Sequence, residues 1–191
     1  LVTGVQTCAL PISYWNPRSN RFGYFSGYGF YAVKNWVWEN TGTGGWTNPY
    51  ANNNGCTPPK RVGTQMARNA DGSKLYFFSG QGSCDGNQFA SSCSLGSAWA
   101  TDVGIYCWLR DIWELDLSNY TFRNILPVNS SSISKQGSFS YDFDTNTFYY
   151  FGGYVPSPTY NPNIGNILTF TNEVFRYRVG IDNGFQQISV Q

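Results

Sequence analysis

The chain has 191 residues, a net charge of +1 and only 12 % charged residues, so no broad electrostatic field would attract nucleic acid or an anionic membrane. No apolar run approaches the roughly 20 residues of a membrane-spanning helix. Aromatic residues make up 18 % of the sequence, and no helical periodicity is sustained along it. This composition predicts an all-β fold with an aromatic core, since one aromatic side chain can bury about 150–250 Å².

The first stretch, VTGVQTCALPI at residues 2–12, resembles the read-through translation of a common sequencing adaptor. It has neither the basic start nor the continuous apolar stretch of a signal peptide. We therefore interpret residues 1–13 as a non-native segment, omit Cys8 from the cysteine count, and expect the native N-terminus to be missing. A natural N-terminal strand is the alternative interpretation.

Three aromatic phrases each end in a glycine step: FGYFSGYG, LYFFSGQG and FYYFGGYV. Their alignment makes Gly27, Gly80 and Gly153 equivalent, and Gly152 completes a double glycine in the third copy. An Asn-Pro, Asp-Gly or Asp/Asn turn precedes each phrase. Short aromatic runs bounded by such turns are typical of strands, and a glycine at the end of a strand lets another backbone come close.

Two further phrases follow each glycine step in a fixed order. The second phrase reads NWVWEN, RDIWEL and NEVFRY, and it places Trp38, Trp113 and Phe175 in one slot. The third phrase places Trp46, Phe122 and Phe185 in another slot. We expect these aromatic side chains to pack between neighbouring sheets. The pattern predicts three units of four strands, a to d, in an up-and-down meander at about 14–48, 62–125 and 137–191.

Four-stranded units that repeat at about fifty residues are typical of propeller blades. The phrases resemble the kelch repeat, in which a double glycine precedes an Asn-Asp-Val-Trp-like strand and a final Trp. The resemblance covers residues 14–191, although the double glycine is intact only in the third copy and two of the final aromatics are Phe. It implies a partial β-propeller of about three kelch-like blades. Because propellers typically carry 4–8 blades, we expect the remaining blades to be missing from this fragment.

In such a meander the b–c and d–a connections share one end of the sheets. The b–c connections at about 81–109 and 154–171 are the longest, and the d–a connections at about 49–62 and 126–137 are intermediate in length. Long loops on a rigid scaffold commonly carry binding residues. We expect aromatic and amide side chains on this face to stack on a sugar or to anchor a protein. The candidates are Trp99, Tyr106, Tyr160, Asn52 and Asn53.

The same connections hold the four remaining cysteines, Cys56, Cys84, Cys93 and Cys107. Four cysteines allow three pairings. We expect Cys84–Cys93 and Cys56–Cys107, because the second bridge would join the two neighbouring connections. Disulfides indicate an extracellular, periplasmic or cell-surface location. A zinc site is not expected, since the chain has no C-x-x-C pair and no His.

Acidic residues offer two possible sites of chemistry. Asp142, Asp144 and Asn146 match the opening of a calcium loop, but its sixth-position Gly and twelfth-position Glu are absent, so we interpret the cluster as a turn. Glu39 and Glu114 share one repeat position, and Glu173 lies close to it. Equivalent positions in different blades favour a structural or solvent-exposed role over a catalytic carboxylate pair. No catalytic residue is assigned.

The kelch resemblance allows two functional hypotheses. The first is a non-catalytic scaffold, without a cofactor, that binds a glycan or a protein through the long-loop face. The alternative is the propeller part of a galactose-oxidase-like copper-radical oxidase. That copper site uses His and Tyr ligands with a Cys crosslinked to a Tyr, so under this hypothesis copper ligands must lie outside the fragment, which has no His.

Overall fold

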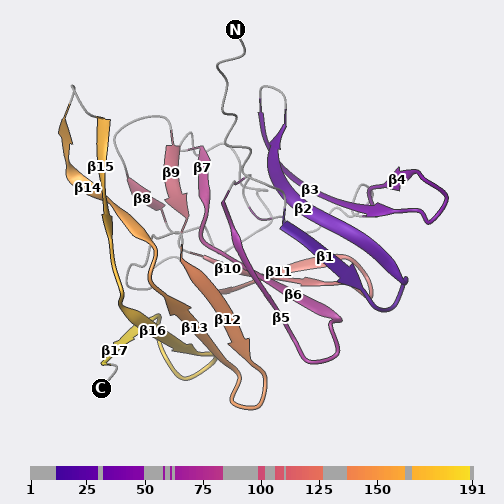
Figure 1. The fold of residues 1–191 in the computed structure, drawn as a ribbon. Coiled ribbons are helices and arrows are strands. Elements are labelled where there is room, and N and C mark those ends of the chain that lie inside the picture. The colour runs from indigo at the N-terminus through magenta and orange to yellow at the C-terminus, as the bar shows by residue number, and fades with distance from the viewer. Residues whose placement is uncertain are drawn as a thin grey trace, which may run out of the picture.

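The computed structural model describes residues 12–29, 32–49, 58, 61, 63–83, 99–101, 106–109, 111–126, 137–161 and 165–189. Across these residues all regular structure is β-strand, and three four-stranded antiparallel sheets follow one another along the chain (Figure 1). The predicted all-β class and the three four-stranded units are confirmed. In the described part of the chain, no helix has the length and apolar character to cross a membrane.

Each main sheet is a meander in which strands a, b, c and d pair in order. The first sheet contains β1 (Ile12–Asn16), β2 (Arg21–Gly29), β3 (Ala32–Asn40) and β4 (Trp46–Thr47). The second contains β5 (Gln65–Arg68), β6 (Lys74–Phe78), β10 (Ile112–Asp116) and β11 (Thr121–Leu126). The third contains β12 (Ser138–Asp142), β13 (Thr147–Phe151), β16 (Val174–Arg178) and β17 (Gln186–Ile188). Strand β1 begins inside the segment 1–13, whose adaptor origin stays a prediction.

Two smaller sheets occupy the long b–c connections, for which the sequence predicts loops. The first contains β7 (Gln81–Ser83), β8 (Trp99–Thr101) and β9 (Tyr106–Leu109) in the order β7-β9-β8. The second is a hairpin of β14 (Tyr154–Asn161) and β15 (Gly165–Phe170). Both small sheets lie at the upper end of the molecule in Figure 1, whereas the β5–β6 and β12–β13 turns lie at the lower end.

The three main sheets share one register between strands b and c. The cross-strand pairs are Tyr24 with Trp38, Phe77 with Trp113, and Tyr150 with Phe175. The residue on strand b lies three positions before the aligned glycine in every copy. Trp38, Trp113 and Phe175, which share one position of the sequence repeat, therefore occupy equivalent positions in three separate sheets.

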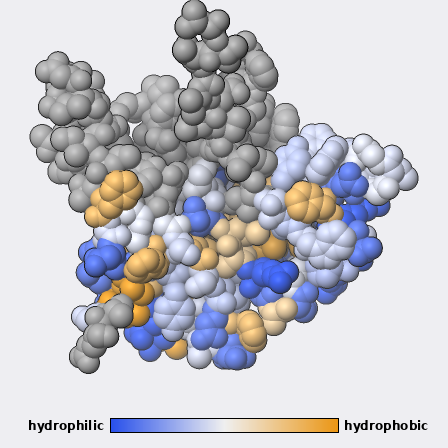
Figure 2. Space-filling model, in the orientation of Figure 1, coloured by the Kyte–Doolittle hydropathy of each residue, from blue (hydrophilic) through white to orange (hydrophobic). Residues whose placement is uncertain are grey.

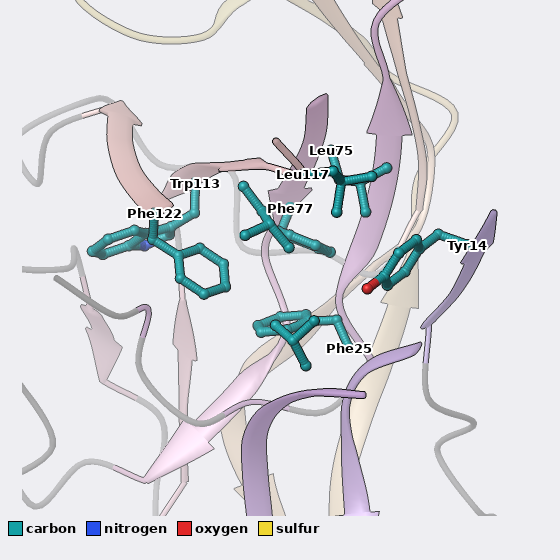
Figure 3. Packing of buried hydrophobic residues seen from close by; sticks show 9 residues of the cluster. Tyr14, Phe25, Leu75, Phe77, Trp113, Leu117 and Phe122 are labelled. Carbon is teal, nitrogen blue, oxygen red and sulfur yellow. The ribbon is translucent and has the colours of Figure 1, made fainter. Parts of the chain in front are cut away.

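The first and second sheets pack face to face through an aromatic cluster. Figure 3 shows Phe25, from the first sheet, pointing at Phe77 of the second, with Phe122 to one side. The ring centroids of Phe25 and Phe77 lie 4.2 Å apart, and those of Phe25 and Phe122 lie 5.7 Å apart. Burial of one such side chain contributes about 1.5–3 kcal/mol. The cluster contains Tyr14, Phe25, Val37, Leu75, Phe77, Trp113, Leu115, Leu117 and Phe122.

The second and third sheets pack in the same way. Phe78 of β6 contacts Tyr150, with ring centroids 5.0 Å apart, and Phe185, at 4.9 Å. The middle sheet therefore buries both of its faces, which explains why four consecutive residues of β6, Leu75 to Phe78, are apolar and buried, and why the first four residues of β10 are buried as well. This second cluster contains Tyr76, Phe78, Ile112, Leu126, Phe139, Phe148, Tyr150, Tyr177 and Phe185.

The outer face of the first sheet remains exposed, which corrects the expectation that Trp46 packs between neighbouring sheets. Phe122 and Phe185 are buried between sheets, but the equivalent Trp46 is 45 % exposed. No sheet among the described residues covers its face. Trp15 and Phe22, which pair across β1 and β2, are also about half exposed. On the side turned to the viewer, Figure 2 shows hydrophobic side chains as separate orange spots among hydrophilic ones.

Candidate functional site

The predicted binding residues lie on strands of the two small sheets. The register places Trp99 of β8 opposite Leu109, and Tyr106 of β9 opposite Ser83. Tyr160 lies on β14 opposite Asn166. The structure therefore brings Trp99 and Tyr106 into one small sheet and places Tyr160 in the other. Asn52 and Asn53 lie outside the described residues.

The cysteine pairings stay a prediction. Cys107 lies on the central strand of the three-stranded sheet, where it pairs with Gly82 on one side and with Thr101 on the other. Cys56, Cys84 and Cys93 lie outside the described residues.

The glycine steps direct the chain into these small sheets. In the second sheet Ser79 and Gly80 have φ angles of 61° and 104°, and in the third Gly152 and Gly153 have 66° and 87°. This left-handed backbone is readily available to glycine but strained for serine. It ends strand b, after which the Gly80 carbonyl accepts a hydrogen bond from the Leu109 amide at 2.8 Å.

The first sheet uses its glycine differently. Strand β2 continues through Gly27 as far as Gly29 and stays paired with β3, with a register shift between Phe25 and Gly27. A glycine inside a strand often marks such a bulge. The first sheet therefore has a direct b–c hairpin, whereas the other two have inserted sheets.

A buried ion pair lies at the end of the second sheet where the chain leaves for the small sheet of β7, β8 and β9. Arg61 Nη1 donates to Asp111 Oδ1 at 2.7 Å, and Nη2 donates to Oδ2 at 2.9 Å; both side chains are fully buried. The Trp113 indole also donates to Asp111. Arg61 Nη1 reaches the Ser79 carbonyl at 3.1 Å. Arg61 belongs to the d–a connection, whereas Ser79 and Asp111 bracket the b–c connection, so this cluster holds the two together.

Sequence reasoning missed this pair. Arg61 lies outside every repeated phrase and 50 residues before Asp111. The one local signal was that Asp111 precedes the repeated Trp113 slot by two positions, where Glu173 precedes Phe175. Fully buried arginine is rare unless it is paired, and this geometry satisfies both charged groups.

Glu39 lies in a second buried polar cluster, between the first and second sheets. Its Oε1 accepts from Tyr14 Oη at 3.1 Å and from Asn16 Nδ2 at 2.9 Å. Its Oε2 accepts from Ser19 Oγ at 3.2 Å and from Tyr120 Oη at 2.8 Å. Tyr120 belongs to the β10–β11 turn, so the carboxylate joins two sheets.

Burial and the nearby Glu39 charge raise the pKa of both tyrosines. The pKa of Tyr120 rises to about 12, first because burial disfavours the phenolate and then because its hydroxyl donates to Glu39. The pKa of Tyr14 also rises, for the same causes. Both hydroxyls therefore remain protonated donors at neutral pH.

The equivalent Glu114 is also engaged. Its two oxygens accept from Lys74 Nζ at 3.2 Å and from Arg123 Nη2 at 3.1 Å. Glu39 and Glu114 are both buried, which is consistent with the structural role rather than the exposed one. The oxygens of both carboxylates accept hydrogen bonds from neighbouring side chains.

The acidic turn before β13 has Asx-turn geometry. Asp142 Oδ1 accepts from the Asp144 amide at 3.0 Å, and Oδ2 accepts from Thr145 Oγ1 at 2.6 Å. These bonds are those of a turn-forming aspartate. Within the described ranges no group of three His, Cys, Asp or Glu side chains could hold a metal ion. The whole chain lacks His, so the residues present do not fit the imidazole ligands of a galactose-oxidase-like copper site.

No protein-family model matches the chain, and none of the curated proteins matches it. The resemblance to the kelch repeat therefore rests on the internal repeat of the sequence.

Proposed function

We propose that the chain forms three blades of a kelch-type β-propeller and acts as a non-catalytic scaffold. In this proposal it binds a protein or a glycan through the end of the sheets that carries the b–c and d–a connections. The same proposal includes further blades that complete the propeller, and an oxidising compartment as the location of the protein.

The main support is the position of the two small sheets. Each grows from a b–c connection, and both lie at one end of the molecule (Figure 1). Residues on strands are positioned more firmly than residues on loops, which lowers the entropic cost of binding a partner. Aromatic side chains at such positions supply large contact area to a sugar face or a protein surface.

The buried charges support a scaffold over an enzyme. Arg61 and Asp111 neutralise each other, and the oxygens of Glu39 and Glu114 accept hydrogen bonds from neighbouring side chains. A catalytic carboxylate or base needs a face open to its substrate. These groups instead fix the sheets and the connections that leave them.

The proposal is tested by screening the chain against a glycan array and against a display library of extracellular domains. For any ligand found, Trp99→Ala and Tyr160→Ala should each weaken binding at least tenfold if these residues are anchors. Phe143→Ala is the matched control, because Phe143 is 55 % exposed on the β12–β13 turn at the opposite end.

Equal loss in the Phe143→Ala variant would place the binding site elsewhere. A ligand whose affinity is unchanged in both the Trp99→Ala and the Tyr160→Ala variants would contradict the proposal that this face binds the ligand. Stoichiometric copper binding with oxidase activity would replace the scaffold with the oxidase hypothesis.

A further inference from the structure

A three-ring arrangement recurs at both interfaces between main sheets. The Phe two positions before the glycine of one sheet packs against two rings of the next sheet. Both rings belong to the following sheet. One lies three positions before the aligned glycine of that sheet, and the other is the final aromatic residue of its repeat. Phe25 contacts Phe77 and Phe122 in this way, and Phe78 contacts Tyr150 and Phe185.

The third sheet carries the same Phe, and no further sheet in the described part of the chain packs against it. Phe151 pairs across the strands with Val174, just as Phe25 pairs with Val37 and Phe78 with Ile112. In the first two sheets both members of the pair are fully buried. Phe151 is 53 % exposed. The outer face of the third sheet thus presents the inserting half of the interface.

The first sheet carries the receiving half. Tyr24 and Trp46 occupy the positions of Phe77 and Phe122, and their ring centroids lie 5.2 Å apart. The filled counterparts are wider, at 6.4 Å for Phe77–Phe122 and 6.5 Å for Tyr150–Phe185. Tyr24 and Trp46 therefore lie closer together than the two rings of the filled interfaces, and no Phe among the described residues packs between them. Trp46 is 45 % exposed, and the half-exposed Trp15 and Phe22 lie on the same face.

A polar group on the third sheet agrees with this arrangement. Arg176 occupies the repeat position of Glu39 and Glu114. Glu39 accepts a hydrogen bond from Tyr120 of the next sheet. Arg176 Nε is buried and has no hydrogen-bond partner among the described residues. A buried donor of this kind needs an acceptor, which a following sheet would supply.

We propose that a second copy of the chain packs head to tail on the first, with Phe151 of one copy against Tyr24 and Trp46 of the other. We choose a second copy as the partner because the chain itself forms this interface twice, with the same repeat positions. Each copy also exposes both surfaces of the interface, one on its third sheet and one on its first sheet. The contact is heterologous, so two copies close into a ring or further copies extend the array. In such an assembly the second copy supplies the further blades that the propeller proposal requires. The inference does not depend on the proposed ligand-binding face.

The experiment measures molar mass by sedimentation equilibrium over a concentration series. The wild-type chain should associate as its concentration rises. Phe151→Asp and Trp46→Asp should each be monomeric, because each destroys one half of the contact. An equimolar mixture of the two variants should form a 1:1 dimer, since each variant keeps the half that the other lacks.

Phe143→Asp is the matched control, because Phe143 is as exposed as Phe151 but lies on a turn outside this face; it should associate like the wild type. Circular dichroism verifies that the variants keep their β structure. A wild-type chain that stays monomeric at every concentration would overturn the proposal. So would association that survives Phe151→Asp, or a mixture of the two variants that remains monomeric.

Discussion

Arg61 and Asp111 bind each other through two parallel hydrogen bonds inside the second sheet, although 50 residues separate them in the sequence. Neither side chain is exposed to solvent. The pair connects the segment entering the second sheet to the segment that returns from its inserted small sheet. Its geometry is the planar, two-pronged contact that arginine makes with a carboxylate.

Removing one partner should be costly, because it leaves a buried charge uncompensated. We expect Asp111→Ala to lower the free energy of unfolding by about 3–5 kcal/mol, measured by denaturant titration. Arg123→Gln is the control, since Arg123 binds Glu114 from a side chain that is 68 % exposed and should cost about 1 kcal/mol or less. A loss at Asp111 no larger than the control would contradict the structural role of the pair.

The Glu39 cluster predicts a fall in stability at high pH. Tyr120 keeps its proton in the folded state up to a pKa of about 12, whereas in the unfolded chain it loses the proton near 10. The unfolded state therefore binds fewer protons between these values, and stability decreases as the pH rises through them. Tyr120→Phe should flatten part of this decrease in chemical unfolding curves measured from pH 9 to 12. Glu39→Gln should also flatten the decrease, because the substitution removes the charge that helps to raise the pKa of Tyr120. Identical pH dependence in all three proteins would exclude this coupling.

The repeated Phe predicts matched effects in two sheets and a smaller effect in the third. Phe25→Ala and Phe78→Ala should each lower the free energy of unfolding by about 3–5 kcal/mol, because each empties a closed aromatic cluster. Phe151→Ala, at the equivalent but half-exposed position, should cost about 1 kcal/mol or less at a dilution where the chain is monomeric. An equally large loss at Phe151 would mean that this face is covered within the monomer.

The sequence predicted the strands and units because their signals are local. The aromatic phrases, the glycine steps and the turns lie within a few residues of each other, so Trp38, Trp113 and Phe175 could be aligned without a structure. The b–c register then follows from pairing neighbouring strands. The hairpin of β14 and β15 was also open to prediction, because Asn161 and Pro162 are typical turn residues.

The rest depends on contacts between distant segments. Trp46 repeats the position of Phe122, but its burial depends on whether another sheet covers it, which the repeat pattern does not encode. The Glu39 cluster needs Tyr120, which comes from another sheet and lies 81 residues away. Arg61 and Asp111 meet for the same reason. Sequence patterns of this kind identify the elements and leave the partners of buried polar groups undetermined.

The cysteine prediction is tested by peptide mapping of the unreduced protein. Proteolysis followed by mass spectrometry should recover Cys84 joined to Cys93, and Cys56 joined to Cys107. Cys8 should be found as a free thiol, because it lies in the segment interpreted as adaptor-derived. Any other pairing, or four free thiols in protein prepared under oxidising conditions, would contradict the prediction.

The central proposal is that the three main sheets are blades arranged around one axis. Pulsed electron paramagnetic resonance can measure this with genetically encoded spin labels, two at a time, at Arg18, Asp71 and Asp144. These exposed turn residues each lie nine positions before the aligned glycine. The account predicts equal distances for 18–71 and 71–144, and an 18–144 distance longer than either but clearly shorter than their sum. Unequal neighbouring distances, or an 18–144 distance equal to the sum as in a straight stack of sheets, would contradict it.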